Sequence, residues 1–434
     1  MEWDTGAAAW MLTSASLVLL MTPGLAFFYG GMVRGKSVLN MMMMSFGAMG
    51  VVGVIYVLWG WSMSYGSSVA GVFGNPFDQF GLSGTLFDAE GLPMVGLGNY
   101  PQVIDVAFQV TFAIITVALI SGALADRTRF GTWMAFVAIW VTVTYFPMAH
   151  MVWGGGQLSG AEGSIAAMLF GTTDGEANTA PIDFAGGTVV HINAGVAALV
   201  LALIIGKRKG FGTEAMRPHN LPFVMLGAAL LWFGWFGFNA GSAFGADENA
   251  GMAWVNTTSC TAAAMIAWLV TEKIRDGHAT SLGAASGVVA GLVAITPAAG
   301  ALRPVTSIVL GVVAGVLCAL AVGLKYRFGY DDSLDVVGVH LVGGLVGTVM
   351  IGFLAADGGL FFGGGLNLLI IQVVIALVAI LFSGLTTLVI GLILKSTLGW
   401  RVSQDVEVSG IDLAVHGETA YENLGGARVV SEVK

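Results

Sequence analysis

Eleven stretches of mostly apolar residues constrain this chain more than any other feature of its sequence. A helix needs about 20 apolar residues to cross the roughly 30 Å hydrocarbon core of a bilayer, because it rises about 1.5 Å per residue. The stretches are continuously apolar rather than alternating, so they indicate spanning helices and not barrel strands. They cover approximately residues 7–29, 38–61, 103–124, 131–151, 184–206, 220–243, 249–271, 280–300, 304–324, 335–355 and 366–394.

The composition supports a membrane protein and excludes several other classes. Of the 434 residues, 56% are hydrophobic and only 10% are charged, whereas a soluble domain carries about 25% charged residues. This excludes a disordered chain, a nucleic-acid binder and an ordinary soluble enzyme. Cys260 and Cys318 both lie inside apolar stretches, so we expect buried thiols, no metal and no cofactor. The fold class is therefore predicted to be an all-α polytopic membrane protein.

The distribution of lysine and arginine predicts the orientation of the chain, because positive loops stay in the cytoplasm. With the N-terminus outside and the C-terminus inside, only Arg303 of the 17 basic residues would lie outside. The segments 62–102 and 152–183 contain no lysine or arginine and fit external loops. The first stretch has no basic region before it, so we interpret it as a span and not a cleaved signal peptide.

Two short strings indicate an internal repeat. Val-His-Ile-Asn-Ala-Gly at 190–195 lies in the fifth stretch, and Val-His-Leu-Val-Gly-Gly at 339–344 lies in the tenth. Five spans separate them, and because five is odd the two halves must be inverted relative to each other. Helices 1–5 (about 7–206) and 6–10 (about 220–355) would form the repeat, with helix 11 at 366–394. Transporters with a site near the bilayer midplane use this design.

The best candidates for function are His191 and His340, because an ionisable residue at membrane depth is costly and usually functional. An alternative is that they are satisfied core histidines that join helices. A zinc site would need further ligands, which the sequence does not offer at that depth. Each histidine follows an aspartate, Asp183 eight residues before His191 and Asp335 five residues before His340. Two roles are open for Asp183. It could cap the N-terminus of a helix, or its negative charge could help a nearby site attract a cation.

Aromatic residues cluster near the expected external mouth. Trp153 follows the fourth stretch, and the sixth contains Trp232, Phe233, Trp235, Phe236 and Phe238. A cation over aromatic faces gains about 0.5–2 kcal/mol, but aromatic belts also anchor membrane proteins at the interface. The spacing alone leaves both interpretations open.

Glycines spaced four residues apart predict close packing of helices. They are Gly283, Gly287 and Gly291 in the eighth stretch, and Gly311 with Gly315 in the ninth. Small residues at this spacing let two helix backbones approach each other closely. We interpret them as structural.

Five strings along the chain resemble the motifs of one family. They are Pro23–Gly31, Ala149–Gly156, Asp183–Asn193, Gly234–Ser242 and Asp335–His340. In this order they resemble the ammonium transporter family, which also includes methylammonium permeases and Rhesus glycoproteins, and the chain is most similar to a bacterial-type member. The resemblance implies a multi-pass protein of the inner (plasma) membrane, and not an enzyme or a nucleic-acid binder.

The resemblance also implies roles for particular residues. Phe112, Trp153 and Ser242 match the external site that recruits ammonium, and Asp183 matches the aspartate needed near it. Phe112 and Phe238 match two stacked phenyl rings that close the pore below that site.

His191 and His340 match the twin histidines of a narrow apolar path that conducts ammonia. The sequence does not decide whether the proton crosses separately along this pair or stays outside. It also leaves the preference between ammonium and methylammonium open.

The resemblance extends to assembly and to the tail. It implies a homotrimer in membrane lipid with one pore per subunit, and residues 1–394 as the transmembrane domain. Residues 395–434 would form a cytoplasmic regulatory tail that docks onto it. Residues 410–421 resemble the family's tail motif, with Ile411 in place of the usual leucine; through this motif subunits communicate, and a PII-type signalling protein can block the exit.

Three other functions are alternatives for this chain. An ammonium sensor would signal through the tail, but residues 395–434 provide no signalling domain. A membrane-embedded enzyme would need a nucleophile or a metal site beside the histidines. A pore for another small neutral solute is the third alternative.

Overall fold

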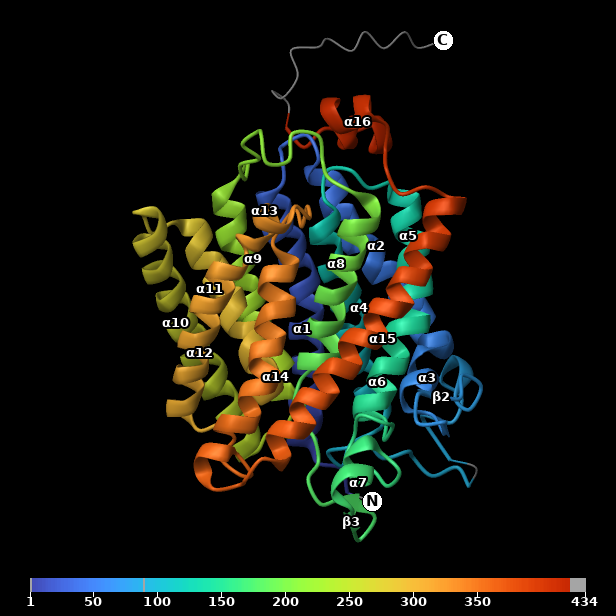
Figure 1. Cartoon of the computed structure of the whole chain (residues 1–434). Helices are drawn as coiled ribbons and strands as arrows, with labels where there is room; N and C mark the ends of the chain where they lie inside the picture. Colours follow the sequence, from blue (N-terminus) through green and yellow to red (C-terminus); the bar gives the residue numbers. More distant parts are fainter. Residues whose placement is uncertain (1, 89, 422–434) are drawn as a thin grey trace.

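The computed structural model describes residues 2–88 and 90–421, and within these it contains eleven helical segments that are long and apolar enough to cross a membrane. They form one bundle (Figure 1). The segments are Thr5–Met32, Val38–Tyr65, Val103–Leu124, Phe130–Trp153, Gly187–Ile205, Leu221–Ala240, Glu248–Asp276, Ser281–Ala298, Pro304–Phe328, Val337–Leu354 and Asn367–Thr397. The predicted all-helical fold with eleven spans is confirmed, and most boundaries agree within a few residues.

Three spans are single continuous α-helices, and each of the other eight consists of two or three consecutive helical segments. The long α-helices are α1 (Thr5–Met32), α10 (Glu248–Asp276) and α15 (Asn367–Thr397). The composite spans are α2 (Val38–Ile55) with η1 (Tyr56–Gly60) and α3 (Trp61–Tyr65), α4 (Val103–Ile120) with η3 (Ser121–Leu124), α5 (Phe130–Trp140) with η4 (Val141–Tyr145) and α6 (Phe146–Trp153), η5 (Gly187–Ile192) with α8 (Asn193–Ile205), α9 (Leu221–Trp235) with η6 (Phe236–Ala240), α11 (Ser281–Ile295) with η7 (Thr296–Ala298), α12 (Pro304–Ala321) with α13 (Leu324–Phe328), and η8 (Val337–Leu341) with α14 (Val342–Leu354).

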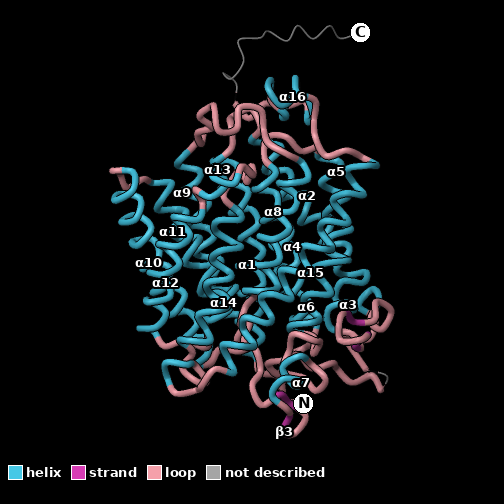
Figure 2. Tube along the Cα trace, viewed as in Figure 1, coloured by secondary structure: helices cyan, strands magenta, loops and turns pink. Residues whose placement is uncertain are grey.

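The two ends of the bundle carry different elements. Near the N-terminus, at the bottom of Figures 1 and 2, lie two small hairpins and the short helix α7 (Ile165–Phe170). The hairpins are antiparallel: β1 (Ser68–Val69) pairs with β2 (Phe73–Gly74), and β3 (Thr172–Thr173) pairs with β4 (Glu176–Ala177). The 3-10 turns η2 (Phe80–Leu82) and η9 (Leu360–Phe362) complete the elements outside the spans at this end. We call this end the N-terminal face.

The opposite end, which we call the tail face, carries α16 (Gln404–Ser409) and η10 (Asp412–His416). An odd number of spans places Glu2 and the described part of the tail on opposite faces of the bundle. The basic residues Arg428 and Lys434, which the orientation prediction includes, lie outside the described residues.

Close helix packing occurs where the glycine spacing predicts it. Helix α10 packs against both α11 and α12. A side chain at Gly311 or Gly315 would collide with the backbone carbonyls of Cys260 and Ala264 in α10. These glycines are therefore structural, and Cys260 is a buried free thiol.

Two carboxylates fasten the described part of the tail to the bundle. The Glu407 side chain is 1% exposed, and it accepts hydrogen bonds from the backbone N–H of Lys209 (2.7 Å) and from Arg401 (2.5 Å). Asp412 accepts hydrogen bonds from the first backbone N–H groups of α2, Leu39 at 2.9 Å and Asn40 at 2.8 Å. The tail thus contacts the loops after the first and fifth spans.

Candidate functional site

The three residues expected to recruit a cation line one hollow on the N-terminal face. Its volume is about 280 Å³. Phe112 comes from the middle of α4, Trp153 from the last residue of α6, and Ser242 from the turn after η6. The Trp153 ring meets the Phe112 ring edge-on, at 6.0 Å and 87°. The structure therefore brings these three predicted residues together, and we call this hollow the vestibule.

Hydrogen bonds hold the polar atoms of the vestibule in place. The indole Nε1 of Trp153 donates to the Asp183 carbonyl at 2.9 Å. The Ser242 hydroxyl donates to the Phe238 carbonyl at 2.8 Å, which leaves its oxygen lone pairs free to accept hydrogen bonds from a bound cation.

The sequence prediction missed two polar residues that also line the vestibule, Gln109 and Tyr65. Gln109 lies three residues before Phe112 in α4, and this spacing puts both side chains on one helix face. The spacing could have identified Gln109. Tyr65 ends the second span, and no sequence signal connects it with α4.

Two phenyl rings separate the vestibule from the interior. Phe112 and Phe238 are stacked, with ring centroids 4.2 Å apart and an interplanar angle of 24°. Both side chains are buried. Phe112 lines the vestibule and Phe238 lines the next cavity, so the stacked pair lies between the two spaces, at the position of the predicted gate.

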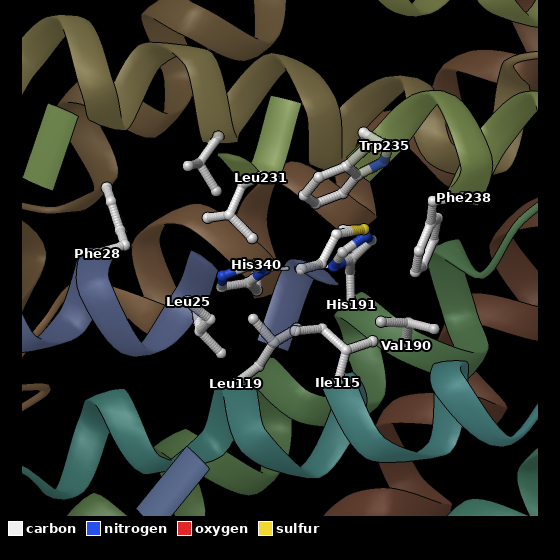
Figure 3. Close-up of a pocket in the computed structure, with 12 residues that line it drawn as sticks. Leu25, Phe28, Ile115, Leu119, Val190, His191, Leu231, Trp235, Phe238 and His340 are labelled. Atoms are coloured by element: carbon white, nitrogen blue, oxygen red, sulfur yellow. Dashed lines mark hydrogen bonds between the residues drawn. The ribbon is translucent and has the colours of Figure 1, made fainter. Parts of the chain in front are cut away.

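Behind the gate, His191 and His340 face each other in a narrow cavity (Figure 3). Their Nδ1 atoms are 3.2 Å apart. The two imidazole rings are nearly parallel, with their centroids 5.3 Å apart and an interplanar angle of 20°. The cavity measures about 10 Å³, close to the space for one water molecule. Figure 3 shows the histidines between Phe238 and Phe28, surrounded by apolar side chains.

The hydrogen bond between the two histidines joins η5 to η8 but leaves a ring nitrogen without a partner in the described part of the chain. Within the described residues, the Nδ1 atoms bond only to each other and the Nε2 of His191 has no partner. A single hydrogen bond between two Nδ1 atoms requires one ring to donate and the other to accept. The pair therefore has two complementary tautomeric arrangements, and the Nε2 of His191 is free to form a further hydrogen bond.

Trp235 is the aromatic residue of the pore that the sequence prediction did not select. Its ring stacks on His191 at 5.6 Å and 15°, and it lines the cavity one turn before Phe238. Two other aromatic residues of this span point elsewhere: Phe236 stacks on Trp254 of α10 at 4.4 Å, and Phe233 is 57% exposed. The predicted aromatic cluster is thus divided between the pore and the outer surface.

The backbone that carries each histidine is a π-helical turn capped by an aspartate. His191 lies in η5 and His340 lies in η8, and π-helical turns are frequent at functional sites. The Asp183 carboxylate accepts hydrogen bonds from the backbone N–H groups of Gly186, Gly187, Thr188 and Val189 and from the Thr188 hydroxyl. The Asp183 carboxylate therefore caps this helix start, although the N-cap position itself is occupied by Gly186.

The counterpart of Asp183 in the second half is Asp332 and not Asp335. Asp332 accepts hydrogen bonds from the N–H groups of Val336 (3.0 Å) and Val337 (2.7 Å) at the start of η8. It precedes its histidine by eight residues, like Asp183. Asp335 instead pairs with Lys325 at 2.7 Å. The comparison of Asp335 with Asp183 was wrong because proximity in sequence to the histidine does not decide which carboxylate reaches the helix end.

Beyond the histidines, a more polar hollow of about 160 Å³ lies toward the tail face, and it includes Lys325 and Asp335. Met32 lines this hollow and Phe28, one turn earlier in α1, lines the histidine cavity. The vestibule, gate, histidine cavity and polar hollow thus follow one another through the bundle.

A buried charge network supports the wall of the polar hollow. Asp331 binds Arg208 (2.9 Å) and lies 3.9 Å from Arg127, and Arg208 also binds Asp126 (3.2 Å). Burial favours the neutral carboxyl of Asp331, but the hydrogen bonds and charges of Arg208 and Arg127 outweigh it and hold its pKa below the usual range. Among the described residues, no group of three or more histidine, cysteine, aspartate or glutamate side chains could hold a metal ion.

Known proteins are similar to this chain over most of its length. The model of the Ammonium Transporter Family matches residues 9–421. A protein named ammonium transporter from Mycobacterium tuberculosis is 54% identical, covering 96% of this chain and 91% of its own length. Another of that name, from Aquifex aeolicus, is 46% identical, with 96% and 94% covered.

Solved structures are also similar to this chain over most of its length. The Mep2 structure from Candida albicans superposes with a TM-score of 0.82 at 30% identity, covering 93% of this chain and 88% of that one. A structure described as Sensor Amt Protein reaches a TM-score of 0.83 at 27% identity, with 95% and 98% covered. The chain therefore belongs to the Ammonium Transporter Family.

Proposed function

We propose that this membrane transporter recruits ammonium in the vestibule, removes one proton at the gate below it and conducts ammonia past the twin histidines. Phe112 and Trp153 offer aromatic faces to the cation, and the Ser242 oxygen accepts one of its hydrogen bonds. The gain from aromatic faces is about 0.5–2 kcal/mol and grows as water is removed. The N-terminal face would be outside the cell.

The histidine cavity is the observation that carries this proposal. A bare ion in such an apolar space would cost several kcal/mol even after relaxation, whereas neutral ammonia crosses without that penalty. Ammonium and potassium are similar in size, so a rigid hole separates them poorly. Loss of a proton separates them completely, because potassium has none to lose.

The proton would cross separately through the histidine pair. One N–H bond of ammonium breaks at the gate, ammonia moves on, and the proton passes along the ring nitrogens, which exchange donor and acceptor roles. Ammonia regains a proton in the polar hollow at the tail face. This pathway moves one net charge for each ammonium taken up.

The test is an ammonium pulse on proteoliposomes, with current and internal ammonia recorded in parallel. We expect the wild type to give both signals. Phe112→Ala should weaken apparent ammonium affinity about 3- to 30-fold, from the loss of the aromatic contact. His191→Ala should lose the current. Phe236→Leu is the control, because Phe236 lies in η6 beside Phe238 but packs on Trp254 of α10, outside the pore.

Each outcome has a distinct meaning. An unchanged current in His191→Ala would contradict the proton path along the histidines. Ammonia uptake without current in the wild type would show electroneutral passage. Phe112→Ala indistinguishable from Phe236→Leu would contradict the recruiting site.

The remaining proposals concern assembly and regulation. We propose a homotrimer in the inner (plasma) membrane, with residues 1–394 as the transmembrane domain and 395–434 as a cytoplasmic tail that a PII-type protein can contact. Cross-linking of the full chain in native membranes tests the trimer. Co-purification with a PII-type protein with and without the tail tests the partner.

An ammonium sensor is the second candidate, because of the similarity to the structure described as Sensor Amt Protein. A sensor would bind ammonium in the same vestibule without sustained uptake. Binding without any ammonia accumulation in the proteoliposome assay would favour it over transport.

A further inference from the structure

A second hollow on the tail face is distinct from the pore. Its volume is about 480 Å³ and it is open to the surroundings. It lies beside the end of α8, the loop after α15 and the start of the tail. Its lining residues are Lys207, Lys209, Arg401, Val402, Gln404 and Glu407, and none of them lines the vestibule, the histidine cavity or the polar hollow.

The charges in this hollow are not balanced. Its one carboxylate, Glu407, has both oxygens engaged, one by the Lys209 backbone N–H and one by Arg401. Arg401 also donates to the Lys207 carbonyl at 2.7 Å, so the guanidinium is fixed in position. Lys207 and Lys209 are exposed and form no ion pair within residues 2–88 and 90–421. The Lys207 ammonium also lies over the Phe211 ring, 5.8 Å from its centroid. Three basic side chains therefore line the hollow with a single carboxylate, and this excess of positive charge favours an anionic ligand.

The surface next to the hollow is apolar and belongs to membrane-spanning helices. Helix α8 ends at Ile205 and α15 ends at Thr397, and the two pack together near this end, where Lys395 donates to the Ile204 carbonyl at 3.0 Å. Large apolar side chains project outward from this part of both helices. They are Leu203 (63% exposed), Leu392 (48%), Ile393 (54%) and Leu398 (49%).

We propose that this hollow binds the phosphate headgroup of an anionic phospholipid, with the acyl chains against α8 and α15. The combination of a basic hollow at a helix end and an exposed apolar helix face fits an amphipathic anion, and basic pockets at the cytoplasmic side of spanning helices bind such headgroups. A small soluble anion would use the charges but not the apolar face. The lipid would contact Arg401, the residue that holds the Glu407 carboxylate of the tail.

The test uses the purified full-length protein in neutral detergent and counts bound lipids by native mass spectrometry. Phosphatidylglycerol and phosphatidylcholine with identical acyl chains are titrated in parallel. The test variant is Lys207→Gln/Lys209→Gln, and the matched control is Lys273→Gln/Arg327→Gln, which removes two exposed charges elsewhere on the tail face. Both pairs are exposed, and size-exclusion elution together with ammonium uptake confirms that each variant folds.

We expect the wild type and the control to bind phosphatidylglycerol at least tenfold more tightly than phosphatidylcholine. The test variant should lose about 30-fold in phosphatidylglycerol affinity, which is the usual effect of two basic residues near an anionic surface. Its affinity for phosphatidylcholine should not change. Added salt should reduce the selectivity, because salt screens exposed charges.

Three results would overturn the proposal. The first is equal affinity of the wild type for the two lipids. The second is equal loss in the test and control variants, which would indicate a general charge effect. The third is displacement of phosphatidylglycerol by inorganic phosphate at equal concentration, which would assign the hollow to a soluble anion.

Discussion

Asp183 offers a direct test of how the histidine helix is held, because its carboxylate could act through hydrogen bonds or through its charge. The structure shows four backbone N–H groups and one hydroxyl donating to it. In Asp183→Ala these donors lose their partner, and each buried unsatisfied group costs about 1–3 kcal/mol. Since some will reach water, we expect a total loss of about 3–5 kcal/mol in the free energy of unfolding.

Two further variants separate hydrogen bonding from charge. Asp183→Asn keeps one acceptor oxygen and replaces the other with a donor, so about half of the hydrogen bonds are lost and we expect about 2 kcal/mol of destabilisation. Asp183→Glu keeps the charge but moves it by one methylene group, which breaks the alignment with the helix start. If capping is the role, both variants lose stability and transport together.

The measurements are unfolding by a denaturing detergent and ammonium-driven current in proteoliposomes. Asp247→Ala is the control: Asp247 caps α10 through one bond to Ala250 N–H at 2.9 Å, so its loss should cost about 1 kcal/mol and leave transport unchanged. The capping argument fails if Asp183→Glu transports like the wild type while Asp183→Asn loses transport at full stability. That result would assign the role to the negative charge.

Three further predictions address packing, the charge network and the pore. Gly311→Leu should destabilise the protein by more than about 2 kcal/mol, because its side chain would meet the backbone of α10; Gly251→Ala, at an open position, should not, and thermal unfolding compares the two. Asp331→Asn should cost about 1–3 kcal/mol at pH 7, since the buried Arg208 loses one of its two carboxylate partners and keeps only Asp126. Because the pKa of Asp331 is held below its usual value, its stabilising effect is present above about pH 4 and disappears as the pH falls; unfolding at pH 3, 5 and 7 should show a smaller acid loss in Asp331→Asn than in the wild type. Trp235→Leu should widen the histidine cavity and lower the ratio of ammonium to potassium flux, measured in the same vesicles.

The spans could be predicted from sequence because the bilayer imposes one simple requirement on each of them. An apolar stretch near 20 residues long satisfies it whatever its neighbours are. The division of a span into α and π pieces could not be predicted, since it depends on contacts with other helices. Trp235 and Phe236 are adjacent in sequence, yet one lines the pore and the other packs on α10.

The predicted recruiting, gate and histidine residues lie along one path, but the reasons for their positions came only from the structure. His191 and His340 are far apart in the chain, and their 3.2 Å contact needs two helices to meet at the correct depth. Gln109 shares a helix face with Phe112 and was overlooked because an amide in an apolar stretch carries no charge. Tyr65 could not be found, since its place depends on how the second span packs.

The two capping aspartates show that the two halves of the repeat share a hydrogen-bonding requirement more closely than they share residue identities. Asp183 and Asp332 each precede a histidine by eight residues, and each accepts hydrogen bonds from the first N–H groups of a π-helical turn. The residues between aspartate and histidine differ almost completely, so sequence comparison favoured the nearer Asp335. What both halves require is a carboxylate at the start of a helix whose π turn directs an imidazole into the cavity. A helix start buried in a membrane protein has little water to satisfy its N–H groups, and this requirement fixes the position of the aspartate more firmly than the residues that follow it.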